Sequence, residues 1–237
     1  MEYNILGKSG IRVSKMCFGT LTLGPLQKNY SVREGANLLS YAYDKGINFL
    51  DTAELYDNYA QIKESLINRP RDSVNIFTKS YAYDSKTAED SLAKALKELN
   101  TDYIDGFLLH EQESEHTLRG HMEAAEFFVR ANEKGYIRTF GVSTHSINCV
   151  LASLKYDFID VIHPLFNKSG IGILDGSASE MLSAIKTARN KGVGISSMKP
   201  LGGGNLIKNY GEALDYVLSV DEIDSIAIGM QSTFEID

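Results

Sequence analysis

The 237-residue sequence lacks the features that mark secreted, membrane-spanning and nucleic-acid-binding proteins. Its two cysteines, Cys17 and Cys149, stand far apart without a metal-binding spacing, and we expect buried free thiols rather than a disulfide. No apolar stretch approaches the roughly 18 residues of a transmembrane helix, and no basic segment precedes an apolar run at the N-terminus. Lys and Arg do not cluster, and the net charge of −7 at pH 7 argues against nucleic acid as a partner. These absences predict a cytoplasmic protein with no membrane contact and no metal.

Short apolar runs alternate with amphipathic segments along almost the whole chain. The runs do not alternate strictly between apolar and polar residues, which is typical of strands buried on both faces. We expect eight strands, at residues 14–20, 47–51, 74–79, 104–110, 137–143, 158–165, 193–198 and 225–229. An eightfold strand–helix pattern of this length predicts one α/β domain, residues 1–237, folded as a (β/α)8 TIM barrel. The alternative is an open doubly wound sheet, although Gly202-Gly203-Gly204 lacks the G-x-G-x-x-G spacing of a Rossmann fold.

The two ends of the chain add to this pattern. Residues 3–13 contain Gly7 and Gly10 between short apolar runs, which predicts an N-terminal β-hairpin. The sequence ends at Asp237, about eight residues after the last predicted strand. We therefore expect the barrel to be truncated there and to lack a complete eighth helix. The flank of strand eight would then be uncovered and could contact another subunit or a partner protein.

Three successive predicted strands each end on an ionisable side chain. These residues are Asp51, Lys79 and His110, and Tyr56 stands on the loop after the first of the three strands. The carboxyl ends of parallel strands meet at one edge, where α/β proteins bind their ligands. Taken singly, each residue could be a turn cap, a solvated strand end or a polar residue at the edge of the core. Together they predict a catalytic site.

The chemistry of the four groups suits proton transfer to a carbonyl oxygen. A nearby ammonium stabilises a phenolate, so Lys79 is expected to lower the pKa of the Tyr56 phenol. Asp51 would keep Lys79 charged, and the His110 imidazole would donate a hydrogen bond to the substrate oxygen. Neither a nucleophile nor a metal set accompanies them, so hydride would have to come from a cofactor.

Motifs along the whole chain resemble those of the aldo-keto reductase family. They are SKMCFGTLTLG at 14–24, DTAELY at 51–56, TK at 78–79, DYID at 102–105, LLH at 108–110, RTFGVS at 138–143 and KPLGGG at 199–204. By this resemblance Asp51, Tyr56, Lys79 and His110 correspond to the family's catalytic residues, with Tyr56 as the general acid. The resemblance implies an NAD(P)H-dependent oxidoreductase that reversibly reduces a small-molecule aldehyde or ketone to an alcohol. NADPH is the usual cofactor of the family, and NADH is the other option.

The same resemblance implies a set of cofactor-binding residues. His163 stands where many members have a glutamine, and Met198 stands where many have a tyrosine stacked on the nicotinamide. A thioether can also pack on a ring face. Gly229, Gln231 and Ser232 stand where the cofactor phosphates would meet the start of the eighth helix. The implied residues are Gly19, Thr20, Ser143, His163, Met198, Pro200, Leu201, Gly229, Gln231 and Ser232.

Two features separate this sequence from the general pattern of the family. The basic residues that members place after strand eight to hold the 2′-phosphate are absent from Thr233-Phe234-Glu235-Ile236-Asp237. The cysteine cluster of the iron–sulfur segment that often follows the KPLGGG type of loop is absent as well. An alternative function is therefore a non-catalytic barrel that acts as a regulatory or binding subunit.

Overall fold

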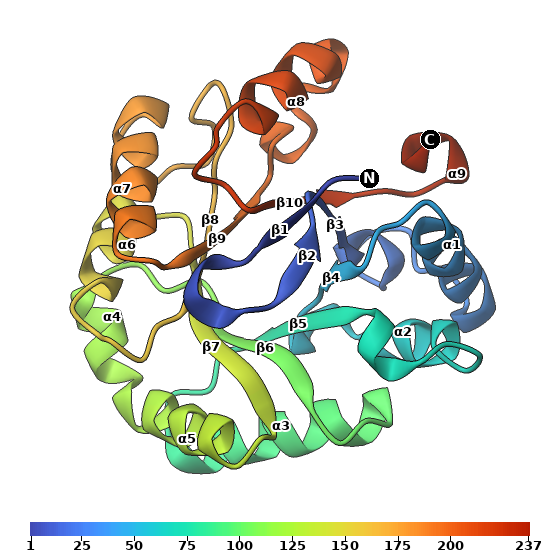
Figure 1. Ribbon diagram of the computed structural model, residues 1–237, viewed down its shortest axis with the longest axis horizontal. Coiled ribbons are helices and arrows are strands. Elements are labelled where there is room, and N and C mark those ends of the chain that lie inside the picture. Colours follow the sequence, from blue (N-terminus) through green and yellow to red (C-terminus); the bar gives the residue numbers. More distant parts are fainter.

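Eight parallel strands close into a barrel in the computed structural model, which describes residues 1–237 (Figure 1). The last strand pairs with the first, and Ile226 lies opposite Met16 in the register. The predicted (β/α)8 fold is therefore confirmed, and the open sheet is excluded. The sixth barrel strand covers residues 161–164 and is shorter than the predicted range of 158–165. The strands are β3 (Met16–Gly19), β4 (Phe49–Asp51), β5 (Asn75–Ser80), β6 (Ile104–Leu109), β7 (Ile137–Thr144), β8 (Val161–Pro164), β9 (Gly194–Met198) and β10 (Ser225–Gly229).

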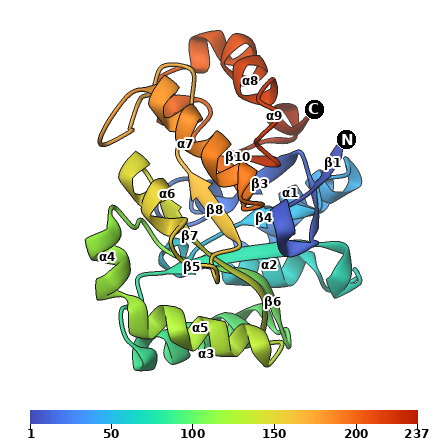
Figure 2. The same ribbon diagram turned by 60° about the vertical axis from the view of Figure 1, so that its left-hand side comes forward.

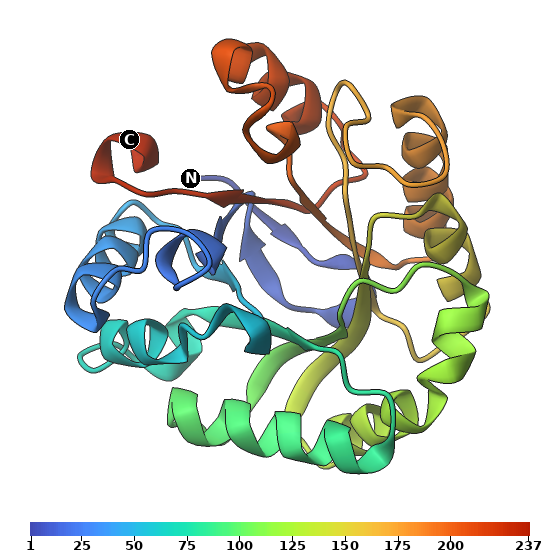
Figure 3. The same ribbon diagram turned by 180° about the vertical axis from the view of Figure 1, so that it is seen from behind.

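Helices form an outer layer around the strands in every view (Figures 1, 2 and 3). Two helices follow β6 rather than one, because the backbone leaves the helical conformation at His121, directly after Gly120. None of the helices combines the length and the apolar character needed to cross a membrane. The helices are α1 (Val32–Asp44), α2 (Tyr59–Ser65), α3 (Ser85–Leu99), α4 (Glu115–Gly120), α5 (Met122–Glu133), α6 (Ile147–Ser153), α7 (Ala178–Asn190), α8 (Tyr210–Leu218) and α9 (Thr233–Ile236).

The predicted N-terminal hairpin is present and closes one end of the barrel. Strands β1 (Tyr3–Ile5) and β2 (Arg12–Ser14) pair antiparallel, and in Figure 1 they lie across the centre of the barrel. Leu6, Ile11 and Val13 pack beneath an apolar layer inside the barrel. That layer consists of Cys17, Phe49, Phe77, Leu108, Val161 and Ala227. Since apolar side chains fill this end, only the end with the carboxyl termini of the strands is free to form a polar site.

The helix that follows the last barrel strand, α9, has four residues within this sequence. The expectation that strand eight would be uncovered is nevertheless wrong. Ile226 and Ile228 of β10 are 0% and 8% exposed, and Ile236 of α9 packs against the same core. The Tyr41 hydroxyl of α1 donates to the Asp237 carboxylate at 2.8 Å and holds the short helix against α1. Both cysteines are free and buried, as predicted.

A buried carboxylate stabilises the opposite side of the barrel. Asp105 of β6 accepts hydrogen bonds from Arg71 and Arg138, both at 2.7 Å, and from the backbone N–H of Ile76 at 2.9 Å. Its side chain is 1% exposed. The carboxylate thus links strands β5, β6 and β7, and its partners satisfy both of its oxygens.

We expect Asp105→Ala to lower the free energy of unfolding by about 3–5 kcal/mol, because it leaves the guanidinium groups of Arg71 and Arg138 without their buried partner. Urea denaturation measures this change. Asp102→Ala removes a carboxylate from an exposed position three residues earlier and should change stability by less than about 0.5 kcal/mol. Equal effects of the two substitutions would contradict a structural role for the Asp105 network.

Candidate active site

Strands β4 and β5 bring an acid and an amine into direct contact inside the barrel. Lys79 Nζ donates to Asp51 Oδ1 and to the backbone oxygen of Thr52, both at 2.7 Å. The side chains of Lys79 and Asp51 are 1% and 10% exposed. Asp51 follows Phe49 by two residues, and Lys79 follows Phe77 by two. Because alternate side chains of a strand share a face, both point into the barrel above the apolar layer. The ion pair is therefore buried between the apolar floor and the open end.

Tyr56 and His110 complete the predicted set at the same end. Tyr56 follows β4 on a short 3-10 turn, and Lys79 Nζ lies 5.1 Å from the centroid of its ring. The ring of His110, directly after β6, meets the Tyr56 ring edge to face with centroids 5.9 Å apart. The structure thus brings all four predicted side chains together.

Two residues that the sequence analysis missed hold the Tyr56 loop in place. Asn58 is fully buried; its side-chain N–H donates to the Thr20 backbone oxygen at 2.7 Å, and its side-chain oxygen accepts from the Thr52 hydroxyl at 2.7 Å. Gly24 packs so closely that a Cβ atom there would lie 2.2 Å from the backbone oxygen of Tyr56. Asn58 and Gly24 therefore fix the loop after β4, which carries Tyr56, against the loop after β3.

One ring nitrogen of His110 has no hydrogen-bond partner. Its Nδ1 is buried and has no hydrogen-bond partner, and the Tyr81 ring stacks on the imidazole with centroids 4.6 Å apart. The Tyr81 hydroxyl donates in turn to the carboxylate of Glu111. Burial, together with the nearby Lys79 charge, lowers the pKa of His110 to about 3. The imidazole is therefore neutral near pH 7 and can donate one hydrogen bond.

Burial and charge set the protonation states of the other three groups. Burial raises the pKa of Tyr56 above its usual value and outweighs the opposing effect of Lys79, so the expected net lowering is wrong. Burial would also raise the pKa of Asp51, but the neighbouring Lys79 and His163 hold it well below its usual range. The pKa of Lys79 lies above its usual range because Asp51 outweighs the burial of the amine. At neutral pH the site therefore holds a phenol, a carboxylate and an ammonium.

A cavity of about 430 Å³ opens beside this group, and Asp51 and Tyr56 form part of its wall. Cβ atoms on Gly203 and Gly204 would meet no atom within 4 Å, and both residues have positive φ. The cavity is within the size range of cofactor and ligand sites. Most of the predicted cofactor-binding residues line it, namely Gly19, His163, Met198, Pro200, Leu201, Gly229 and Gln231.

The remaining predicted cofactor residues, Thr20, Ser143 and Ser232, are not among the residues that line the cavity. The Thr20 hydroxyl donates to the backbone oxygen of Asp51 at 3.1 Å, and the Ser143 hydroxyl accepts from the Glu111 backbone N–H at 2.9 Å. Ser232 caps α9 through a hydrogen bond from the Glu235 N–H. Ser143 is completely buried, yet its own O–H has no acceptor within the protein. It therefore remains free to donate to a bound group.

A lysine–histidine pair at the cavity mouth was also missed. Lys199, which lines the cavity, has a positive φ of 57°, and its Nζ lies 3.1 Å from Nε2 of His145. Burial and the Lys199 charge lower the pKa of His145 to about 4, so this imidazole accepts the hydrogen bond. Lys199 lies within the KPLGGG motif, whereas the only sequence signal for His145 was its place just after a strand that ends in Ser143.

Comparison with known proteins identifies the family. The sequence model of the aldo/keto reductase family matches residues 15–223. The chain belongs to this family. It is 28% identical over 230 residues to an uncharacterized oxidoreductase, YrpG, of Bacillus subtilis, with 87% of this chain and 68% of that protein covered. It is 25% identical over 226 residues to a probable voltage-gated potassium channel subunit beta of Arabidopsis thaliana, with 89% and 67% covered.

A solved structure supports the same fold. The holo form of an aldo-keto reductase from Bacillus halodurans superposes with a TM-score of 0.82 at 22% identity, covering all of this chain and 88% of that one. At this identity the likeness concerns the barrel alone. Membership of the family, together with a similar oxidoreductase, supports an oxidoreductase function for this aldo-keto reductase.

We expect Gly24→Ala to displace Tyr56, because the new methyl group would overlap the backbone oxygen of that residue. The cost should be about 1–3 kcal/mol of stability, typical of an overpacked site. A crystal structure of the variant measures the displacement. Gly211→Ala, where a Cβ meets nothing within 4 Å, is the matched control. An unmoved Tyr56 in the Gly24 variant would show that the loop has other means of fixing its position.

Proposed function

We propose that this aldo-keto reductase uses NAD(P)H to reduce an aldehyde or ketone reversibly to an alcohol, with Tyr56 as the general acid. One observation carries the proposal: Tyr56, Lys79, Asp51 and His110 lie together at the edge of the cavity. Their protonation states suit reduction, since the phenol holds a proton while the ammonium beside it favours the phenolate that follows proton release.

Each side chain has a distinct part in the proposed reaction. The substrate oxygen accepts hydrogen bonds from the Tyr56 hydroxyl and from the neutral His110 imidazole, which orient it. Lys79 stabilises the negative charge left on Tyr56 when its proton moves to that oxygen, and Asp51 keeps Lys79 charged. The nicotinamide cofactor, when bound, supplies the hydride.

The cavity fits a dinucleotide beside these groups. Met198 lines the same cavity as Asp51 and would pack against the nicotinamide ring, while the free Ser143 O–H would donate to its carboxamide. Leu201, Gly229 and Gln231 line the same cavity and would contact the rest of the dinucleotide. We propose NADPH, as in most members of the family, with NADH as the other option.

The alternative function is that of a regulatory or binding subunit. It is supported by the similar Arabidopsis protein, which is named a probable potassium channel subunit beta. Calorimetric titration with NADPH and with NADH, followed by an assay with a panel of aldehydes, separates the two proposals. Cofactor binding with turnover supports the reductase, and binding of neither cofactor supports the alternative.

Tyr56→Phe should lower the rate of carbonyl reduction by about 10²–10⁴-fold, because it removes the proton donor while leaving the ring in place. Cofactor affinity should stay within about twofold, since the aromatic ring that lines the cavity is kept. Loss of reduced-nicotinamide absorbance with an aldehyde measures the rate. Tyr83→Phe removes an exposed phenol, 58% accessible, and should leave the rate unchanged. Full turnover by the Tyr56 variant would rule out this residue as the acid.

Lys79→Met should slow reduction by a similar factor and move the alkaline limb of the pH–rate profile toward higher pH. The substitution removes the ammonium that opposes the burial effect, so the pKa of Tyr56 rises further and the phenol becomes a weaker acid. Rates of the variant and of wild type across pH 6–10 measure the shift. Lys86→Met alters a surface lysine whose side chain is 72% exposed and serves as the control. A limb that stays in place would contradict coupling between the two groups.

A further inference from the structure

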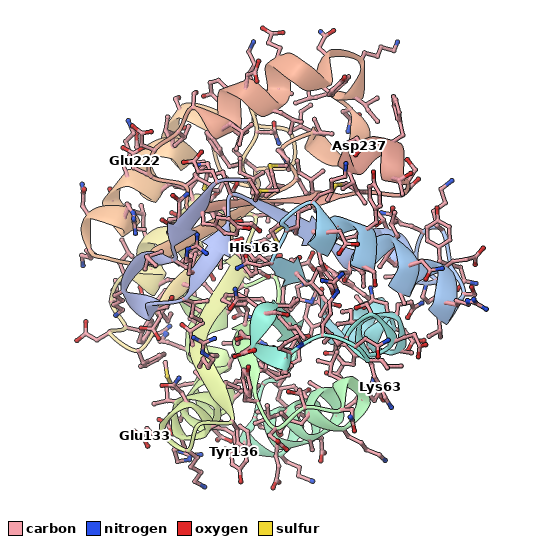
Figure 4. All side chains as sticks on the ribbon, turned by 45° about the vertical axis from the view of Figure 1, so that its right-hand side comes forward. Lys63, Glu133, Tyr136, His163, Glu222 and Asp237 are labelled. Atoms are coloured by element: carbon pink, nitrogen blue, oxygen red, sulfur yellow. The ribbon has the colours of Figure 1, made fainter.

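His163 lies between two oxygen atoms on opposite sides of its ring. Nδ1 is hydrogen-bonded to the backbone oxygen of Ser196 in β9, and Nε2 lies 3.5 Å from Oδ1 of Asp51 in β4. The side chain comes from β8, is 3% exposed, and lies near the centre of the barrel (Figure 4). Its position is thus fixed by strands on both sides of it.

Both oxygens that His163 faces can only accept hydrogen bonds. A backbone carbonyl has no proton to give, and Asp51 is ionised because the neighbouring Lys79 ammonium helps to hold its pKa well below the usual range. A neutral imidazole has one N–H, so one ring nitrogen would present a lone pair to an oxygen lone pair in a buried site. A ring with protons on both nitrogens satisfies the two contacts at once.

We propose that His163 is an imidazolium and acts as a positioning residue that places a second cation on Asp51, opposite Lys79. The protonation state is argued from contacts alone, whereas its effect on catalysis rests on the reductase function proposed above. Lys79 donates to Asp51 and to the oxygen of Thr52; His163 points to Asp51 and to the oxygen of Ser196. Each cation therefore has one carbonyl oxygen of its own and shares a single carboxylate.

The other titratable groups around His163 do not cancel this charge. Burial raises the pKa of the Cys17 thiol on the barrel floor well above its usual value, so the thiol stays neutral. The depressed pKa values of His110 and His145 leave both of these imidazoles neutral, and the Tyr56 phenol keeps its proton. The cluster of Asp51, Lys79 and His163 thus has one positive charge in excess.

The excess charge has a use at this end of the barrel. Negative charge develops on the substrate oxygen and on Tyr56 during reduction, and fixed positive charge in a buried site stabilises it. Because both N–H groups of His163 are committed to Ser196 and Asp51, the ring has no donor left for a cofactor amide. The ring lines the cavity, and its effect on the reaction passes through Asp51 and Lys79.

The protonation state can be measured without cofactor or turnover. In protein labelled with ¹⁵N at histidine, we expect both ring nitrogens of His163 to give signals of protonated nitrogen at pH 7, assigned by their loss in His163→Gln. Asp51→Asn, which removes the carboxylate, should convert one of them to an unprotonated signal. One unprotonated nitrogen in the wild-type protein would overturn the proposal, whether or not the chain reduces carbonyl compounds.

The catalytic consequence has its own test. His163→Gln should lower kcat about 5- to 50-fold while the Kd values of NADPH and NADH change by less than about twofold, and it should move the alkaline limb of the pH–rate profile upward. His116→Gln, at an exposed histidine, should change none of these values. A weakened cofactor Kd with an unchanged kcat would assign His163 to cofactor binding and refute the positioning role. No turnover by the wild type would refute the proposed function and leave the nitrogen signals as a valid result.

Discussion

The buried ion pair between Lys79 and Asp51 is the contact on which the rest of the site depends. Removing two charges from water is costly, and a buried pair is stable only when further hydrogen bonds satisfy both partners. Thr52 supplies one such bond to Lys79, and His163 faces Asp51 from the other side. Parallel strands supply this geometry, because neighbouring strand ends place their interior side chains within hydrogen-bond distance. The pair in turn sets the electrostatic environment of Tyr56.

The apolar end of the barrel makes this pair effective. The hairpin and the interior layer beneath it, which includes Phe49 and Phe77, exclude water from below the charged groups. With water present on one side only, the interaction between Lys79 and Tyr56 is screened less than it would be on the surface. The hairpin thus contributes to the chemistry at the opposite end of the barrel, even though it contacts none of the four groups.

The sequence predicts what depends on short-range pattern and misses what depends on distant contacts. The sequence predicts three site residues, Asp51, Lys79 and His110, because an apolar run stops at each of them. The role of Gly24 was not visible, since it depends on the oxygen of a residue 32 positions later. The prediction that the flank of β10 is uncovered was wrong for a similar reason. The contacts that cover it join α1 to the end of the chain. Family motifs supplied the cofactor residues, which no periodicity would have revealed.

The structure separates the buried charged groups, which lie on strands, from the loops around them. Asp51, Lys79 and His163 lie on strands, where backbone pairing on both sides fixes them. Tyr81 and Glu111 lie on the loops after β5 and β6, where they contact the His110 ring and each other and make no hydrogen bond to the ion pair. A change in these loops can therefore alter the surface beside Tyr56 while the ion pair stays intact. This division is how one barrel serves many substrates.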